Sequence, residues 1–141
     1  MGFSLIAATA ILGITLFMAV EIIVNDLLPT MEEINTSYTT MKDRMQEQLH
    51  TNINITTVVR SVNGTSYNYN ISVENTGSIT LLTDNFIILV DGTVCPFSCS
   101  GEYLYPENIV YFFVENQAGE GEKRLKIITN NGIASFYTSG E

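Results

Sequence analysis

Few residues in this sequence combine the types and spacing that catalysis or metal binding requires. The only two cysteines, Cys95 and Cys99, are four residues apart, and the only histidine is His50. A zinc site would need more ligands than this pair and one distant histidine provide, and a redox motif has one residue fewer between its cysteines. We predict a disulfide between Cys95 and Cys99 that clips an exposed loop, worth about 2 kcal/mol on the chain-entropy model. Two free thiols are the alternative.

The acidic residues do not form a recognisable catalytic pair. Glu120 and Glu122 flank Gly121 in a glycine-rich turn, where a solvated charge is the ordinary role. No turn has the spacing of an EF-hand calcium loop, and the sequence contains neither a phosphate-binding loop nor a G-x-S-x-G nucleophile motif. We predict no catalytic residue, no metal, no cofactor and no enzyme activity.

Charge is distributed unevenly along the chain. Of the 141 residues, 15 are acidic and 6 basic, for a formal net charge of −9, yet residues 1–20 include no charged side chain. So acidic a balance argues against nucleic acid as a partner, because phosphate contacts depend on lysine and arginine. The pattern predicts a membrane segment joined to a soluble, acidic part.

Residues 1–25 are predicted to form a transmembrane helix. The uncharged stretch that begins at Gly2 and runs to Val24, broken only by Glu21, would be about 34 Å long as a helix, enough for a hydrocarbon core of about 30 Å. A signal peptide is the main alternative. It would begin with basic residues, and the first basic residue here is Lys42.

Three residues of this helix are candidate contacts with neighbouring helices. Thr9 and Gly13 form a small-xxx-small pair, which lets two membrane helices approach closely, although small residues are also common in membrane helices generally. Glu21 falls near the outer headgroups, where a carboxylate is tolerated; pairing with a cation of a neighbouring subunit is the alternative.

Residues 26–50 are predicted to form an amphipathic stalk helix, which Pro29 is expected to kink or restart. Apolar residues recur at alternating spacings of four and three, a heptad-like stripe. Its members are Leu27, Met31, Ile34, Tyr38, Met41 and Met45. Self-association as a coiled coil and packing on the chain's own globular part are both open as its role.

Residues 51–141 are predicted to form an all-β, immunoglobulin-like β-sandwich, because β-branched and aromatic runs alternate with turn signals. Three of these signals are the hairpin-type pairs Asn63-Gly64, Asp91-Gly92 and Asn131-Gly132. We predict strands at 53–62, 67–74, 81–82, 85–90, 103–105, 108–115, 123–129 and 134–137. Strands 108–115 and 134–137 are the candidate edges to which a partner could add a strand.

The β part is predicted to lie outside the cytoplasm. Four N-x-S/T sequons are candidate N-glycosylation sites, and a cysteine pair suits an oxidising compartment. The sequons begin at Asn35, Asn54, Asn63 and Asn70. We therefore expect a single-pass membrane protein with an extracellular or pseudoperiplasmic C-terminal domain.

Several phrases resemble those of the accessory proteins of the archaellum, the archaeal flagellum. The opening MGFSLIAATAILGITLF is similar to their pilin-type helix, and Val73-Glu-Asn-Thr-Gly77 to the end of one of their strands. Leu89-Val-Asp-Gly92 is similar to a turn of the family, and the stretch from Ile127 to Ile133 to its closing hairpin. The cysteine pair is a departure from this pattern.

The resemblance implies a stator role in the archaellum motor. It implies that the head binds the S-layer protein, that the chain forms a complex with a sister accessory protein, and that there is no catalysis. The alternative function is a pilin-like or archaellin subunit that polymerises through its N-terminal helix. A filament subunit usually carries a basic leader that is removed before assembly.

Overall fold

The computed structural model of the protein describes residues 1–140. It divides into two compact units, Met1–Asp43 and Arg44–Glu141. The first unit is entirely helical. The second contains the last turns of the helix and all the strands, and is called the head below.

The helical part consists of α1 (Gly2–Ile22), the π-helical turn η1 (Ile23–Leu27) and α2 (Leu28–His50). The chain therefore stays helical past Pro29, and the expected restart does not occur. Proline has no N–H for the helical ladder and its ring crowds the preceding turn, so the wider π turn just before it relieves that conflict. The helix is long and apolar enough to cross a membrane, and none of its residues is buried.

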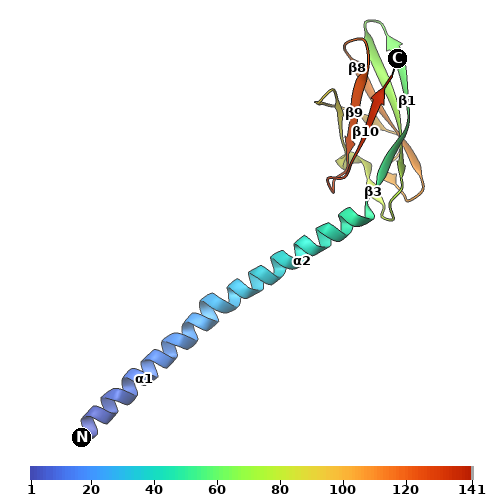
Figure 1. Cartoon of the computed structure of the whole chain (residues 1–141). Helices are drawn as coiled ribbons and strands as arrows, with labels where there is room; N and C mark the ends of the chain where they lie inside the picture. The colour runs from blue at the N-terminus through green and yellow to red at the C-terminus, as the bar shows by residue number, and fades with distance from the viewer. Residues whose placement is uncertain (141) are drawn as a thin grey trace. The chain divides into compact units, whose positions relative to one another are not determined.

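The head is built of antiparallel strands arranged in two four-stranded sheets and one two-stranded pair (Figure 1). The strands are β1 (Ile53–Asn63), β2 (Ser66–Asn75), β3 (Leu81–Leu82), β4 (Ile87–Val90), β5 (Thr93–Cys95), β6 (Ser98–Cys99), β7 (Tyr103–Leu104), β8 (Ile109–Gln117), β9 (Lys123–Ile128) and β10 (Ala134–Ser139). The first sheet has the order β1-β2-β8-β6, the second the order β10-β9-β4-β5, and β3 pairs with β7.

The core lies between the two sheets, because alternate residues of each strand point to opposite faces. Within the first sheet Ile71, Val73 and Phe112 are fully buried, and Ile88 and Ile127 are their counterparts in the second. Phe112 stacks on Phe86 at a centroid distance of 5.4 Å. One continuous apolar cluster thus joins both sheets, as in a β-sandwich.

All eight predicted strands are present, and β5 and β6 were missed. These two have three and two residues, too short for an alternating pattern to reveal. The strand expected at 85–90 begins at Ile87, because a 3₁₀ turn (Thr83–Asn85) precedes it. Strand β8 pairs with β2 and β6, so its prediction as an edge was wrong, whereas β10 pairs only with β9 and is an edge.

Candidate interaction faces of the β-sandwich

The three candidate helix contacts are all exposed. The Thr9 hydroxyl donates to the Ile6 carbonyl at 2.9 Å, so it is satisfied within its own helix. A Cβ added to Gly13 would meet nothing within 4 Å. Glu21 is the last residue but one of α1. These positions are free to meet lipid or another helix.

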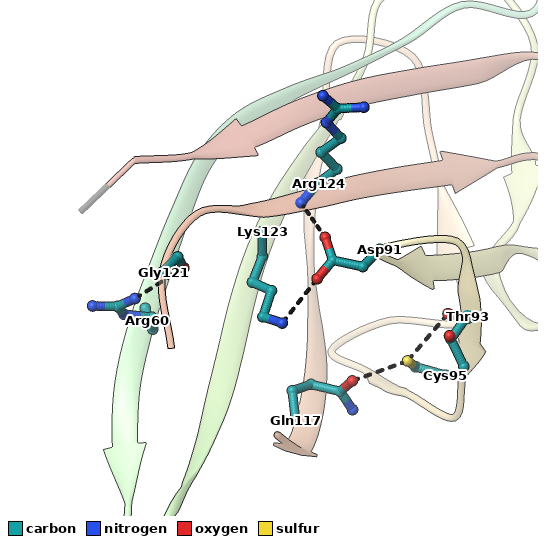
Figure 2. Close-up of polar contacts among 8 residues, drawn as sticks. All are labelled: Arg60, Asp91, Thr93, Cys95, Gln117, Gly121, Lys123 and Arg124. Carbon is teal, nitrogen blue, oxygen red and sulfur yellow. Dashed lines mark hydrogen bonds and ion pairs between the residues drawn. The ribbon is translucent and has the colours of Figure 1, made fainter. Parts of the chain in front are cut away.

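The predicted disulfide between Cys95 and Cys99 is not formed in the structure, where both are free thiols. Cys95 is buried on β5, and its sulfur lies 3.2 Å from Oε1 of Gln117 and 3.4 Å from the Thr93 carbonyl oxygen (Figure 2). Cys99 lies on β6, in the other sheet. The prediction assumed one exposed loop, but these five residues carry the chain from one sheet to the other.

The four sequons lie in different surroundings. Asn35 is exposed on α2, Asn54 is exposed on β1, and Asn63 is exposed where β1 enters its hairpin turn. Asn70 is half-buried on β2, between Val59 of β1 and Phe113 of β8. No sequon lies on the second sheet.

The Val73–Gly77 motif has a structural role that sequence reasoning did not identify. Asn75 is fully buried, and its Nδ2 donates to the carbonyls of Ile79 at 2.7 Å and Leu104 at 3.1 Å. Its Oδ1 accepts from the N–H of Gly77 at 2.9 Å. The motif therefore fixes the end of β2 and the loop after it through the side chain of Asn75.

His50 is the last residue of α2. Its Nδ1 lies 3.1 Å from the Ser78 hydroxyl, and its carbonyl accepts from the N–H of Ser78 at 2.9 Å. Gln48 donates to the Asn131 carbonyl at 2.9 Å, and the Asn131 side chain donates to the Thr51 hydroxyl at 2.7 Å. These bonds make the last turn of α2 a part of the head.

The outer surface of the second sheet carries an apolar row with two cations. The register aligns Phe136 with Lys126, Lys126 with Leu89, and Leu89 with Val94. Lys126 Nζ lies 5.0 Å from the centroid of the Phe136 ring, a cation–π distance. The strands of this sheet contain no acidic residue. We call this surface the basic face; it comprises Ile87, Leu89, Val94, Arg124, Lys126, Ile128 and Phe136.

The hairpin between β4 and β5 holds the one ion pair found among the described residues. Asp91 and Gly92 both have positive φ, of 50° and 84°, as a two-residue hairpin turn requires. The Asp91 carboxylate lies 2.8 Å from Lys123 Nζ and accepts from the N–H of Arg124 at 2.9 Å (Figure 2). The bond from Lys123 lowers the pKa of Asp91 and raises that of Lys123. Arg124 uses only its backbone here, so its guanidinium stays available.

The outer surface of the first sheet has the opposite charge. A bulge between Ile55 and Thr57 sets the register, so Val59 pairs with Asn70, and Asn70 with Phe113. Arg60 points to the other side, with its guanidinium 4.9 Å from the Tyr67 ring centroid. We call this surface the acidic face; it comprises Val59, Asn70, Glu74, Ile109, Tyr111, Phe113 and Glu115.

Within residues 1–140, no three His, Cys, Asp or Glu side chains are grouped closely enough to hold a metal ion. The head instead offers two flat faces of opposite charge and the free edge of β10. Such surfaces suit recognition of another protein.

Comparison with known proteins bears on the function. The chain is 28% identical over 144 residues to the putative flagella-related protein F of Methanocaldococcus jannaschii, covering 98% of this chain and 99% of the relative. No protein-family model matches the chain.

Two solved structures share the fold of the head. The archaellum periplasmic stator protein FlaG of Sulfolobus acidocaldarius matches with a TM-score of 0.55 and 14% identity, over 63% of this chain and 99% of its own. The periplasmic stator complex of FlaF and FlaG from the same organism gives a TM-score of 0.51 at 16% identity, over 62% and 87%. Together with the sequence relative, these structures confirm the resemblance: the chain is similar to the FlaF and FlaG proteins of the archaellum.

Proposed function

We propose that this chain is a membrane-anchored stator component of the archaellum motor, with a head outside the cytoplasm that binds the S-layer protein. The observation that carries the proposal is the match to a flagella-related protein over nearly the whole chain, helix and head together. A helix fit to cross a membrane followed by a β-sandwich supports the same reading.

The mechanics of a stator explain why both parts are needed. A stator resists torque, so it needs one hold in the membrane and a second on a fixed lattice. The apolar helix supplies the first, since every residue of α1 is exposed and available to lipid. The head supplies the second through its faces and the β10 edge, with a sister accessory protein as a further partner.

S-layer binding is tested with the full chain, purified in detergent and immobilised, against solubilised S-layer protein. We expect saturable binding at the acidity and salt of the outer cell surface. The variant Phe136→Ser removes the most exposed aromatic of the head, and Phe3→Ser in α1 is the matched control. If neither the immobilised wild type nor the Phe3→Ser control binds S-layer protein, the S-layer assignment is contradicted.

Membrane topology is tested separately in the native host. We expect the chain to resist alkaline extraction from membranes, and protease added to intact cells to remove the head. Deleting the chromosomal copy should abolish swimming, and a plasmid copy should restore it. Release of the chain by alkali, or protection of the head in intact cells, would contradict the proposed anchoring or orientation.

The second candidate is a pilin-like filament subunit. The feature that favours it is the uniformly apolar, unburied α1 with the Thr9 and Gly13 pair, which suits close helix packing. Isolated filaments decide between the two functions. Many ordered copies along the filament would favour the subunit, whereas a few copies retained with the motor in the membrane would favour the stator.

A further inference from the structure

We propose that α2 pairs as a coiled coil with a helix of a different chain, one that carries carboxylates beside its own apolar seam. The inference goes beyond the stator function and does not depend on S-layer binding. It rests on a narrow apolar stripe that is exposed along α2, and on the way in which charge is sorted around that stripe.

The stripe consists of five residues of α2 whose spacings alternate between three and four, so they occupy the a and d positions of a heptad. We call it the stalk seam; it comprises Met31, Tyr38 and Met45 at a, and Ile34 and Met41 at d. Each of these side chains is between 54% and 69% exposed. Every other residue from 31 to 45 is polar. A stripe confined to a and d is the seam of a coiled coil, whereas a helix that packs on a globular core has a wider apolar face.

Charge is sorted around the stalk seam. The positions that border a seam, e and g, come directly after d and directly before a. Lys42 follows Met41 and Arg44 precedes Met45, and no carboxylate occupies a bordering position between residues 30 and 45. The four acidic residues of α2 all lie at the outer positions b, c and f: Glu32, Glu33, Asp43 and Glu47. The seam is therefore bordered by positive charge alone, although the chain as a whole is strongly acidic.

A second copy of this chain does not supply carboxylates to these cations. In a parallel pair, a g residue of one helix faces the next e residue of the other, so Ser37 would face Lys42. In the same way Arg44 would face Leu49. In an antiparallel pair e faces e and g faces g, which sets neutral or positive residues against one another. Charge complementarity therefore favours a different helix, with carboxylates at its own bordering positions.

The side chains of the stalk seam suit a partner of different sequence. Three of the five are methionines, whose flexible thioether side chains adapt to varied apolar surfaces. Covering the seam removes apolar area from water, and ion pairs along its borders select the partner. On the outer side of α2, the hydroxyls of Thr36, Thr39 and Thr40 each donate to a carbonyl of the preceding turn at 2.9 Å. That side is satisfied without a partner.

The test uses the full chain in detergent and two labelled synthetic peptides of four heptads, with leucine at every a and d position. One peptide carries glutamate and the other lysine at every e and g position, so the two differ only in bordering charge and each repels its own kind. Fluorescence anisotropy measures the binding of each peptide to the chain. A seam variant carries Ile34→Ser and Met41→Ser, which makes the stripe polar.

Charge at the border is tested by a second variant, which carries Lys42→Glu and Arg44→Glu. Its matched control carries Arg124→Glu and Lys126→Glu, the same change in net charge placed on the head. Thermal unfolding verifies that the head of each variant is folded. All of the changed residues of α2 are exposed, so we expect the unfolding temperature to stay the same.

We expect the wild type and the control to bind the glutamate peptide at least tenfold more tightly than the lysine peptide. The border variant should prefer the lysine peptide, and the seam variant should bind neither. Raising the salt concentration should weaken the preference of the wild type, because exposed charges are screened. Equal binding of both peptides by the wild type, or an unchanged preference in the border variant, would overturn the proposal. Sedimentation showing that the wild type pairs with itself through the seam would overturn it too, as would binding to vesicles of anionic lipid in place of the glutamate peptide.

Asn35 offers a check in the native protein. It follows Ile34 and so borders the stalk seam, although it begins a sequon. A glycan at this position would keep a second helix away from the seam. We expect mass spectrometry of the native chain to find Asn35 unmodified, and a glycan on it would contradict the pairing.

Discussion

Gly77 has no side chain at the point where the backbone of His50 passes it. A Cβ built there would lie 2.6 Å from the nitrogen of Asn52 and closer still to the His50 carbonyl oxygen. The N–H groups of Gly77 and Ser78 donate to the carbonyls of Asn52 and His50 at 3.0 and 2.9 Å. The loop after β2 therefore holds the residues at the end of α2 by direct backbone contact.

Gly77→Ala should destabilise the head by about 2 kcal/mol, because backbone atoms on both sides must move to admit the methyl group. Denaturant unfolding of the full chain measures the loss. Gly101→Ala is the matched control, since its nearest contact would be Val110 Cγ1 at an ordinary 3.6 Å. A loss no larger than that of the control would mean that the loop and the helix end are not held together in solution.

Asn75→Ala should cost about 2–3 kcal/mol, because it leaves the Ile79 and Leu104 carbonyls without their buried donor. Asn54→Ala is the control, an exposed asparagine on the neighbouring strand. Unfolding curves for both variants provide the comparison. Equal stability of the two would show that water replaces the amide of Asn75.

The sequence predicted most of the architecture because the head obeys a simple alternation. Tyr69, Ile71 and Val73 point inward with polar residues between them, which marks a strand with one buried side. The same alternation could not reveal β5 and β6. Strand β5 pairs with β4 across the Asp91-Gly92 turn, and β6 pairs with β8, but each is too short to show a period of two.

The candidate faces were much harder to predict. Lys126 and Phe136 become neighbours only through the register of β9 and β10, and Leu89 joins them from a third strand. The conformation of Asp91 was predictable from its turn, whereas its ion pair with Lys123 was not. The separation of Cys95 and Cys99 along the chain does not show that their strands lie in different sheets.

Tyr69→Phe should leave the head as stable or raise its free energy of unfolding by about 1 kcal/mol. The Tyr69 hydroxyl is buried and has no hydrogen-bond partner among the described residues, so its removal relieves a desolvation cost. Burial raises the pKa of this phenol for the same reason. Thermal unfolding of the variant beside Tyr111→Phe, whose side chain is exposed, tests this. Destabilisation by Tyr69→Phe alone would indicate a bound water.

Asp91→Asn should remove a small, pH-dependent contribution to stability. The pKa of Asp91 is lowered by the hydrogen bond from Lys123 and then by the Arg124 N–H. The folded state thus favours the carboxylate, and the contribution is present above the usual aspartate pKa of about 4 and is lost as the pH falls below it. The raised pKa of Lys123 sets the other limit: the contribution is complete below the usual lysine pKa of about 10.4 and is lost as the pH rises beyond it.

The stability difference between wild type and Asp91→Asn should therefore be level from about pH 5 to 9 and shrink in acid. Its size is that of an exposed ion pair, because the Asp91 side chain is 43% exposed. Lys123→Gln should give the same loss, and adding it to Asp91→Asn should cost little more. Additive losses would show that the two side chains do not interact in solution.

Asn70 should carry no glycan in protein from the native host, whereas Asn63 should carry one. Asn63 is exposed at the hairpin between β1 and β2, but Asn70 is half-buried in the acidic face and its Oδ1 is inaccessible. Mass spectrometry of peptides from the native chain distinguishes the two sites. A glycan on Asn70 would cover Phe113 and Val59, its cross-strand neighbours, and would contradict this prediction. Asn63→Gln should abolish the modification at that position.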